Sequence, residues 1–516
     1  MDMSKETLES LYRKYTDDTL KQKLEYYALW TIPSVFPKDS THVPNGNAVI
    51  EHDYQSVGAM LVNRLATKLA GTLFPANASF FRIEANDTLK DLLDKDGVKS
   101  LVELENTACR RLLFNASYAQ LVQALRLLVI TGDVLVKRVN NRVRIFSLKN
   151  YSLRRNNVGE VQDIVIRECI DYSELPDYIK SSLQGKRQPD EKLVLYTRIQ
   201  KITQFVGDIP VSKWVETQEV EGRAVDYEAT YTDNLCPYIP VTWNYVNGDM
   251  YGRGYVEEYA GDFAKLSELS QALTEYELNS CIVLNVYNPA GNFDVDRAVS
   301  SISGDWVSGN KDAVQPYEVG DYNKIQTLVD NIQTIAQRLG VAFMSTSNQR
   351  EGERVTATEV MQNATEAEQV LGGVYSQLSQ SLHMPLAYLL LHEVQPNIIS
   401  AVERGEFQLD ILTGLQALSR SSENQALLVA ASEINAIVPI MAQLSKRFNP
   451  DKIIDSILRA NGVNVDDYTY TEEEMKAMAA QEEQQAQQLA MQQQALQQGA
   501  GQEQAVQAVQ QSQGII

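Results

Sequence analysis

At 516 residues the chain is too long to form one hydrophobic core, and its length predicts about three domains. Its hydrophobic content of 44% is ordinary for a globular protein. The net charge of −21, from 46 Lys and Arg against 67 Asp and Glu, argues against a protein that wraps nucleic acid tightly, because that task requires a basic surface. It leaves open a surface that DNA passes without being held.

Cysteine usage and the N-terminal residues predict a soluble intracellular protein. The first residues, "MDMSKETLES", lack the basic and apolar regions of a signal peptide. The most apolar stretches, "LVQALRLLVI" and "PLAYLLL", are shorter than the roughly 20 residues that a membrane span needs. The four cysteines form no CxxC pair, which indicates neither a disulfide framework nor a zinc site: Cys109, Cys169, Cys236 and Cys281.

The N-terminal part of the chain predicts helices. One helix is expected over 4–30, ended by the two prolines of "TIPSVFP". Two further helices are expected over 87–114 and 117–131. Between them and the first, a helix is predicted over roughly 50–73, because apolar residues recur at every fourth position: Val57, Leu61, Leu65, Leu69 and Leu73.

Short strands are predicted from residue 133 to about 247. "VLVKRVNNRVRIFSL" has the pattern of a hairpin with an Asn-Asn turn, and "NNVGEVQDIVIREC" continues the meander. The stretch 137–155 carries seven basic residues and no acidic one: Lys137, Arg138, Arg142, Arg144, Lys149, Arg154 and Arg155. A patch for nucleic acid or an acidic partner is one interpretation, and an ordinary solvated hairpin face is the favoured one.

Segment 248–340 predicts two helices with a small β module between them, like a head carried on a stalk. "CIVLNVY", "DWV" and "AVQPYEV" are the expected strands of the module, separated by the turns "NPAGN" and "SGNKD". "GDMYGRG" opens the first helix, whose apolar stripe is Tyr255, Tyr259, Phe263, Leu266, Leu269, Leu273 and Tyr276. Its opposite side is acidic, with Glu257, Glu258, Asp262, Glu268, Glu275 and Glu277. The second helix has apolar residues at heptad spacing, at Ile325, Leu328, Ile332, Ile335 and Leu339.

A polar loop and a long helix follow. "STSNQREGERVTATEV", residues 345–360, ends in a capping-box pattern at Thr356 and Glu359. Gly372 and Gly373 lie inside the helix predicted to follow, and such a pair favours a kink. Residues 396–470 predict several shorter helices. The segment 481–516 holds sixteen glutamines, and its composition fits a polar helix and a disordered tail equally.

No catalytic, cofactor-binding or metal-binding motif is present in the sequence. There is neither a phosphate-binding G-x-x-x-x-G-K-[ST] loop nor a G-x-S-x-G elbow. His383 and His392, nine residues apart, would lie on opposite sides of a helix, so core or interface positions are favoured over a shared metal. "DLLDKDGVKSLVE" approaches a calcium loop, but Leu92 occupies the first ligand position. We therefore expect no catalytic residues, no cofactor and no metal.

Four long segments are distinctive: "ALWTIPSVFP", "VGAMLVNRLATKLAGTLFP", "PYIPVTWNYVNGDMYGRGYVEEYAGDF" and "GERVTATEVMQNATEAEQVLGGVYSQLSQSLHMPL". They closely resemble segments of the head-to-tail connector, or portal, protein of short-tailed phages of the Autographivirus type. The resemblance extends in order from about residue 5 to 470. It implies an α+β, predominantly helical portal fold of wing, stem, clip, crown and C-terminal tail, assembled as a ring of typically twelve copies.

The resemblance also implies roles for the predicted segments. Residues 1–253 become the N-terminal part of the wing, 254–281 and 321–340 the stem helices, and 282–320 the clip. Residues 341–355 become the tunnel loop and 356–395 a kinked wing helix. The remainder becomes a crown at 396–475 and a barrel or disordered tail at 476–516. The DNA-facing residues of the tunnel loop would be Ser345, Thr346, Ser347, Asn348, Gln349, Arg350, Glu351 and Arg354.

The resemblance places the protein at one capsid vertex of the virion, after synthesis in the host cytoplasm. Its expected partners are further copies of itself, double-stranded DNA passing through the channel, and the terminase large subunit. The other expected partners are major capsid and scaffolding proteins, a tail adaptor or tail tube, and internal core proteins. No interaction with a membrane is expected. The alternatives are another ring-forming virion component, such as a tail adaptor, and an enzyme acting on nucleic acid.

Overall fold

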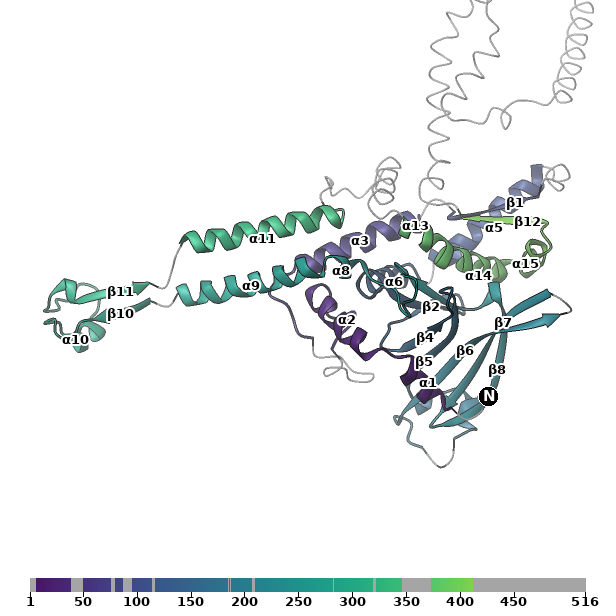
Figure 1. Cartoon of the computed structure of the whole chain (residues 1–516), viewed down its shortest axis with the longest axis horizontal. Helices are drawn as coiled ribbons and strands as arrows, with labels where there is room; N and C mark the ends of the chain where they lie inside the picture. The colour runs from purple at the N-terminus through teal and green to yellow at the C-terminus, as the bar shows by residue number, and fades with distance from the viewer. Residues whose placement is uncertain are drawn as a thin grey trace, which may run out of the picture. The chain divides into compact units, whose positions relative to one another are not determined.

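The computed structural model describes residues 6–38, 50–75, 79–86, 95–113, 117–183, 185, 187–206, 209–281, 283–318, 322–345 and 373–411. The chain divides into two compact units, residues 1–418 and 419–516, and every described residue belongs to the first. Figure 1 shows helices and β-sheets in this unit, so the expectation of an α+β protein is confirmed.

The N-terminal region is helical, as predicted, but the helix expected over 4–30 is two helices. These are α1 (Leu8–Tyr15) and α2 (Asp18–Trp30). The single-helix prediction is wrong because the side chain of Asp17 accepts a hydrogen bond from the backbone N–H of Leu20 at 3.0 Å and so starts a new helix. Three longer helices follow: α3 (Val57–Leu73), α5 (Lys95–Leu113) and α6 (Ser117–Thr131).

The β-rich region forms two antiparallel sheets. One has the order β3-β2-β9, from β2 (Asp133–Val139), β3 (Arg142–Phe146) and β9 (Tyr238–Thr242). Asn140 and Asn141 both have positive φ, 51° and 62°, as a two-residue hairpin turn requires, so the predicted Asn-Asn hairpin is confirmed. The other sheet is a meander of β4 (Tyr151–Arg155), β5 (Val161–Asp171), β6 (Lys192–Val206), β7 (Ile209–Val220) and β8 (Arg223–Thr232).

A further two-stranded sheet joins distant parts of the chain. Strand β1 (Phe81–Ala85) pairs antiparallel with β12 (Phe407–Ile411). The sequence pattern predicted neither strand, and the helical interpretation of 396–470 is wrong at β12. The helices α14 (Met384–Val394) and α15 (Pro396–Glu403) precede β12, and short elements α7 (Asp177–Lys180), η2 (Tyr172–Glu174) and η3 (Asp233–Leu235) lie in the connections.

The predicted pair of helices with a module between them is present. The first is interrupted, with α8 (Tyr255–Glu258) leading into α9 (Ala260–Ser280), and the second is α11 (Tyr322–Ala342). Between them, β10 (Val283–Tyr287) and β11 (Val314–Glu318) pair antiparallel, accompanied by α10 (Val295–Ser300) and η4 (Lys311–Ala313). The "DWV" strand prediction is wrong. Asp294 caps the start of α10, because its side chain accepts a hydrogen bond from the N–H of Arg297.

One hydrophobic core connects the helices, the three-stranded sheet and the base of the helix pair. Its largest fully buried side chains include Trp243, Tyr151, Phe263 and Phe343. Within the described residues no single helix has both the length and the hydropathy of a membrane span. The segments Ser100–Leu112 and Ser117–Thr131 reach those values only together, across a bend of 71°.

Candidate functional site

The helices α9 and α11 lie side by side (Figure 1), and the apolar stripes predicted for them are buried at the end nearest the rest of the unit. Phe263 and Leu266 of α9 are fully buried, and so are Ile335 and Leu339 of α11. An ion pair between Asp262 and Arg338 joins the two helices. The stripe is best covered where the helices meet the rest of the unit and becomes more exposed toward the β module.

An aromatic cluster closes the base of the pair. The ring of Phe343, just after α11, lies 4.9 Å from that of Tyr255 and 5.6 Å from that of Phe263, measured between centroids. The hydroxyl of Tyr255 donates to the carbonyl of Ala342 at 2.9 Å, and its ring contacts Trp243 at 5.7 Å. Because aromatic contacts add to ordinary burial, this cluster fixes both helix ends to the three-stranded sheet.

A buried polar network holds the segment that enters α8. The carboxylate of Asp133 accepts hydrogen bonds from the Thr242 hydroxyl at 2.6 Å and from the backbone N–H of Gly252, and Arg155 lies 3.4 Å away. Burial raises the pKa of Asp133 to about 6, against the opposing effect of Arg155. Glycine is needed nearby, since a Cβ at Gly254 would lie 2.6 Å from a backbone carbonyl oxygen of α6.

The exit from α11 is anchored to α3 by two cations that lie one helical turn apart. Lys68 donates to the carbonyl of Met344 at 2.7 Å, and Arg64 donates to the hydroxyl of Ser345 at 2.7 Å. Met344 itself has a positive φ of 54°, so the chain turns sharply here. Cations are favourable at a helix C-terminus, where carbonyl groups lack partners.

Of the predicted DNA-facing loop residues, Ser345 is the one that the structure describes. The others lie outside the described residues: Thr346, Ser347, Asn348, Gln349, Arg350, Glu351 and Arg354. The capping box at 356–359 and Gly372 also lie outside them. After this gap the chain forms α13 (Gly373–Leu378), the π-helical turn η5 (Ser379–His383) and α14. In this described part, the departure from regular α-helix is at η5.

The predicted core position of His383 is confirmed. Its side chain is fully buried, with the rings of Phe74 and Phe80 each 5.0 Å from its own between centroids. Burial lowers the pKa of this imidazole to about 3. His383 is therefore neutral at ordinary pH. His392, in α14, is exposed.

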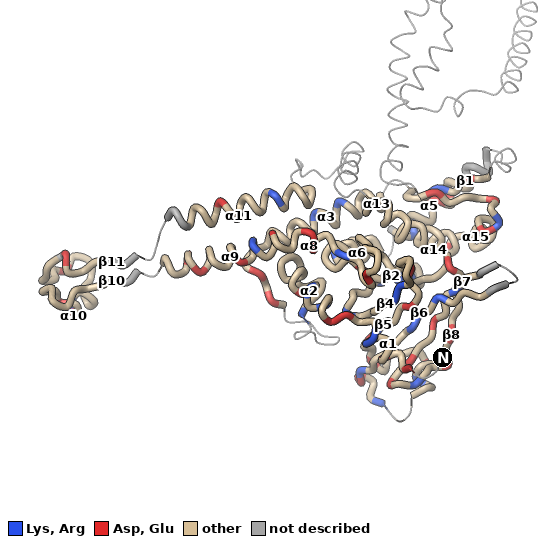
Figure 2. Tube along the Cα trace, in the orientation of Figure 1, with Lys and Arg blue, Asp and Glu red and all other residues tan. Residues whose placement is uncertain are grey.

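The seven basic residues of 137–155 do not lie together on one solvated surface. They are spread over β2, β3, β4 and the intervening turn. Figure 2 shows both basic and acidic residues around β2, β4 and β5. Four form ion pairs within the chain: Arg138 with Glu393, Arg144 with Glu168, Lys149 with Glu25 and Arg155 with Asp133.

The remaining three have different surroundings. Lys137 is partly buried, donates to the hydroxyl of Tyr238 at 2.6 Å, and has its pKa lowered by burial. Arg142 is exposed and Arg154 is half-buried. Most of the local positive charge is thus neutralised by this chain's own carboxylates.

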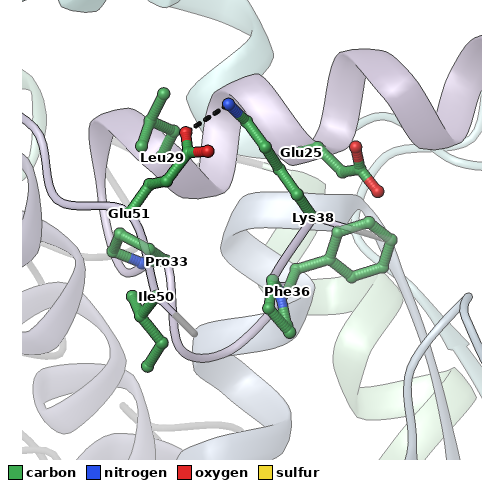
Figure 3. Close-up of a pocket in the computed structure, with 8 residues that line it drawn as sticks. Glu25, Leu29, Pro33, Phe36, Lys38, Ile50 and Glu51 are labelled. Carbon is green, nitrogen blue, oxygen red and sulfur yellow. Dashed lines mark hydrogen bonds and ion pairs between the residues drawn. The ribbon is translucent and has the colours of Figure 1, made fainter. Parts of the chain in front are cut away.

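The described residues contain a small surface hollow and no cluster of side chains that could hold a metal ion. No group of three or more His, Cys, Asp or Glu side chains there is arranged to hold a metal ion. A surface hollow lies between α2 and the segment after it, lined by Glu25, Leu29, Phe36, Lys38 and Glu51 among others (Figure 3). Its enclosed space is about that of one water molecule, and the ion pair of Lys38 with Glu51 spans it.

The acidic side of the first helix remains largely solvent-accessible. Glu258, Glu268, Glu275 and Glu277 are exposed. Partial burial and the neighbouring Glu257 raise the pKa of Glu258. Sequence reasoning found these acids and the helix pair, but missed Asp133, Arg64 and Lys68. The run "TGDVLV" gave only a weak indication of Asp133, as an acidic residue at the start of a buried strand.

Comparison with known proteins matches residues 6–467 to the family model described as bacteriophage head to tail connecting protein. The portal protein of Pseudomonas phage phiKMV is 38% identical over 494 residues, covering 93% of this chain and 95% of its own length. The portal protein of Escherichia phage T7 is 31% identical, covering 94% and 92%.

Among solved structures, a chain of the virion of a native gene transfer agent particle aligns over 80% of this chain and 89% of its own length. Its identity is 11% and its TM-score 0.36, a likeness too low to bear on function. The sequence matches are sufficient by themselves. The chain belongs to the family of bacteriophage head-to-tail connecting proteins, the portal proteins of short-tailed phages.

Proposed function

We propose that copies of this chain, twelve in number, form a ring at one capsid vertex and that DNA passes through the ring during packaging and ejection. The observation that carries the proposal is the pair of helices α9 and α11 with a β module at its tip, in a chain of the connector family. Two helices joined by a module too small to fold alone suit a stem that packs beside identical neighbours. On this proposal α9 and α11 are the stem and 282–320 is the clip.

The charge of the chain suits passage of DNA without trapping. Twelve copies, each with a net charge of −21, would together carry 252 excess negative charges. Acidic residues facing a channel would repel the phosphate backbone of DNA. The exposed acids of the first stem helix, Glu258 and Glu268 among them, are the candidates for that surface. The ion-paired basic residues of 137–155 would add little attraction.

We assign the segment after α11 as the tunnel loop that touches DNA reversibly. Its hydroxyl and amide side chains make replaceable hydrogen bonds, and Arg350 and Arg354 are balanced by Glu351 and Glu353. The hydrogen bond from Arg64 to Ser345 supports this assignment, because a loop that meets moving DNA needs a fixed starting point. The basic residues of 137–155 would then stabilise the fold rather than bind DNA.

The other assignments follow from the family. Residues 1–253 and 356–395 would form the wing, 396–475 the crown and 476–516 a barrel or tail. The ring would contact major capsid and scaffolding proteins at the vertex, the terminase large subunit during packaging, and later the tail adaptor or tube and internal core proteins. Synthesis in the host cytoplasm and residence in the virion complete the proposal. The protein itself would perform no catalysis.

Electron microscopy of the purified protein, together with mass photometry, tests the proposal. Rings with a central pore and twelvefold symmetry are expected without any cofactor. A monodisperse species near 57.9 kDa at micromolar concentration would refute ring formation. ATP turnover by the pure protein, abolished by a substitution in this chain, would refute the absence of catalysis.

A further inference from the structure

The end of α11 is closed by a cap made of Gly340, Val341, Met344 and Ser345, called the α11 cap below. The backbone N–H of Ser345 donates to the carbonyl of Gly340 at 2.7 Å. The backbone N–H of Met344 donates to the carbonyl of Val341 at 3.1 Å. These two bonds form a Schellman motif, in which the residue just past the helix adopts a left-handed conformation. Met344 occupies that position, with a φ of 54°.

Methionine is an unfavourable residue at this position. Glycine usually occupies it, because a β-carbon crowds the left-handed backbone. Methionine is instead a good helix former. The local preference of Met344 is therefore for a helix that continues through it, and the α11 cap needs support from other elements.

That support comes from α3 and α8. Lys68 of α3 donates to the carbonyl of Met344 at 2.7 Å, and Arg64, one helical turn earlier, donates to the hydroxyl of the next residue at 2.7 Å. Tyr255 of α8 donates to the carbonyl of Ala342 at 2.9 Å. Met344 itself is 1% exposed, so packing also holds it in place. An unfavourable backbone conformation persists where the surrounding structure imposes it in this way.

We propose that the α11 cap is one of two states of this helix end, and that Lys68 and Arg64 are positioning residues that hold the capped state. In the other state α11 continues through Met344 and Ser345, whose N–H groups then exchange their acceptors, as α-helical geometry requires. The two states use the same two donors and the same two acceptors. The change therefore sacrifices neither of the backbone hydrogen bonds of the α11 cap.

The change would move the first residue of the assigned tunnel loop. In the capped state the chain leaves α11 at Met344 and is tied to α3. In the extended state each residue added to the helix advances the chain by about 1.5 Å and turns it by about 100°. The loop would thus start from two alternative positions. The consequence for DNA passage rests on the function proposed above, whereas the two states of the helix end do not.

Glycine and alanine at position 344 distinguish the two states. Both delete the buried methionine side chain, but glycine suits the left-handed cap and alanine suits a helix. Hydrogen–deuterium exchange, corrected for intrinsic rates, measures the protection of the amides of residues 344 and 345 in the full chain. We expect exchange about fivefold slower in Met344→Gly than in Met344→Ala, because alanine is strained in the cap.

The same comparison is then made in a chain that carries Arg64→Met and Lys68→Met, which keep long apolar side chains but remove the donors. There the order should reverse, with exchange about fivefold slower in Met344→Ala, because residue 344 now lies in a helix. Arg64→Lys with Lys68→Arg keeps both donors and should preserve the original order. Thr67→Met, at an exposed position of α3, is the matched control and should preserve it too.

A second measurement leaves Met344 in place, so it does not depend on variants at a buried position. In the chain with Arg64→Met and Lys68→Met alone, the amides of residues 344 and 345 should remain protected, because they are bonded in either state. Complete loss of their protection would show a frayed helix end and would overturn the proposal.

Two results of the glycine and alanine comparison would also overturn it. Slower exchange in Met344→Gly with and without the donors would show a single static cap. Slower exchange in Met344→Ala in both chains would show that the α11 cap does not form. These measurements require neither rings nor DNA, so absence of rings from the wild-type protein would contradict the proposed function alone.

Discussion

Burial of His383 makes the free energy of unfolding depend on pH, and the size of this dependence can be predicted. Its imidazole is fully buried between Phe74 and Phe80, and its pKa falls from 6.5 to about 3. The unfolded chain therefore binds a proton at this residue that the folded chain does not. Stability from His383 is fully present above its unfolded pKa and is lost as the pH falls toward its folded pKa.

The magnitude follows from the difference in pKa. Each pKa unit corresponds to about 1.4 kcal/mol, so lowering the pH from about 7 to about 5 should remove about 2 kcal/mol of unfolding free energy through this residue. In His383→Phe that contribution is absent, because phenylalanine binds no proton. Any overpacking by the larger ring lowers stability equally at both pH values.

Urea unfolding of wild type and His383→Phe at both pH values, at one protein concentration, measures the effect. Subtracting the loss in the variant from the loss in wild type cancels the contribution of the other titrating groups, which both proteins contain. Asp133 is one of these groups, and its raised pKa gives the opposite trend, with stability growing as the pH falls from about 6 toward 3.8. Equal losses in wild type and variant would refute a neutral buried histidine at this position.

The remaining predictions concern a buried ion pair, two glycines and the predicted tunnel loop. Glu393→Ala should cost about 3–5 kcal/mol, because Arg138, 1% exposed at its side chain, loses its partner; denaturant midpoints test this. Gly254→Ala should reduce folded yield severely through its clash with α6. Gly261→Ala, with open space around it, should raise the free energy of unfolding by up to about 1 kcal/mol, measured as a slightly higher thermal midpoint. Deleting 345–349 should leave rings and procapsids normal but impair DNA packaging or retention, and wild-type infectivity of that mutant would contradict the tunnel-loop assignment.

Features determined by neighbouring residues could be predicted from the sequence. The helix expected over 117–131 has those bounds in the structure, because its apolar pattern and flanking residues are local. The turn at Asn140 and Asn141 is equally local, since asparagine tolerates the positive φ that a tight hairpin needs. The two helices around the β module were also predicted, because the stripe that each buries is written in its own periodicity.

Contacts between distant residues could not be predicted. Strand β1 pairs with β12, more than three hundred residues later, and neither has a distinctive pattern alone. Arg138 and Glu393 are 255 residues apart in the sequence. The sequence showed a run of basic residues, but only the tertiary structure decided that four of the seven have carboxylate partners within the chain.

The same distinction between local and long-range features applies to the candidate site. The polar loop, the acidic helix and the module between two helices followed from local composition and from resemblance to a family. The hydrogen bonds of Arg64 and Lys68 to the end of α11, and the buried polar network around Asp133, depend on the packing of α3 and β2 against segments far along the chain. Periodicity and turn chemistry specify which element forms, whereas the partner of a side chain is specified by how the elements pack, and that is a property of the whole chain.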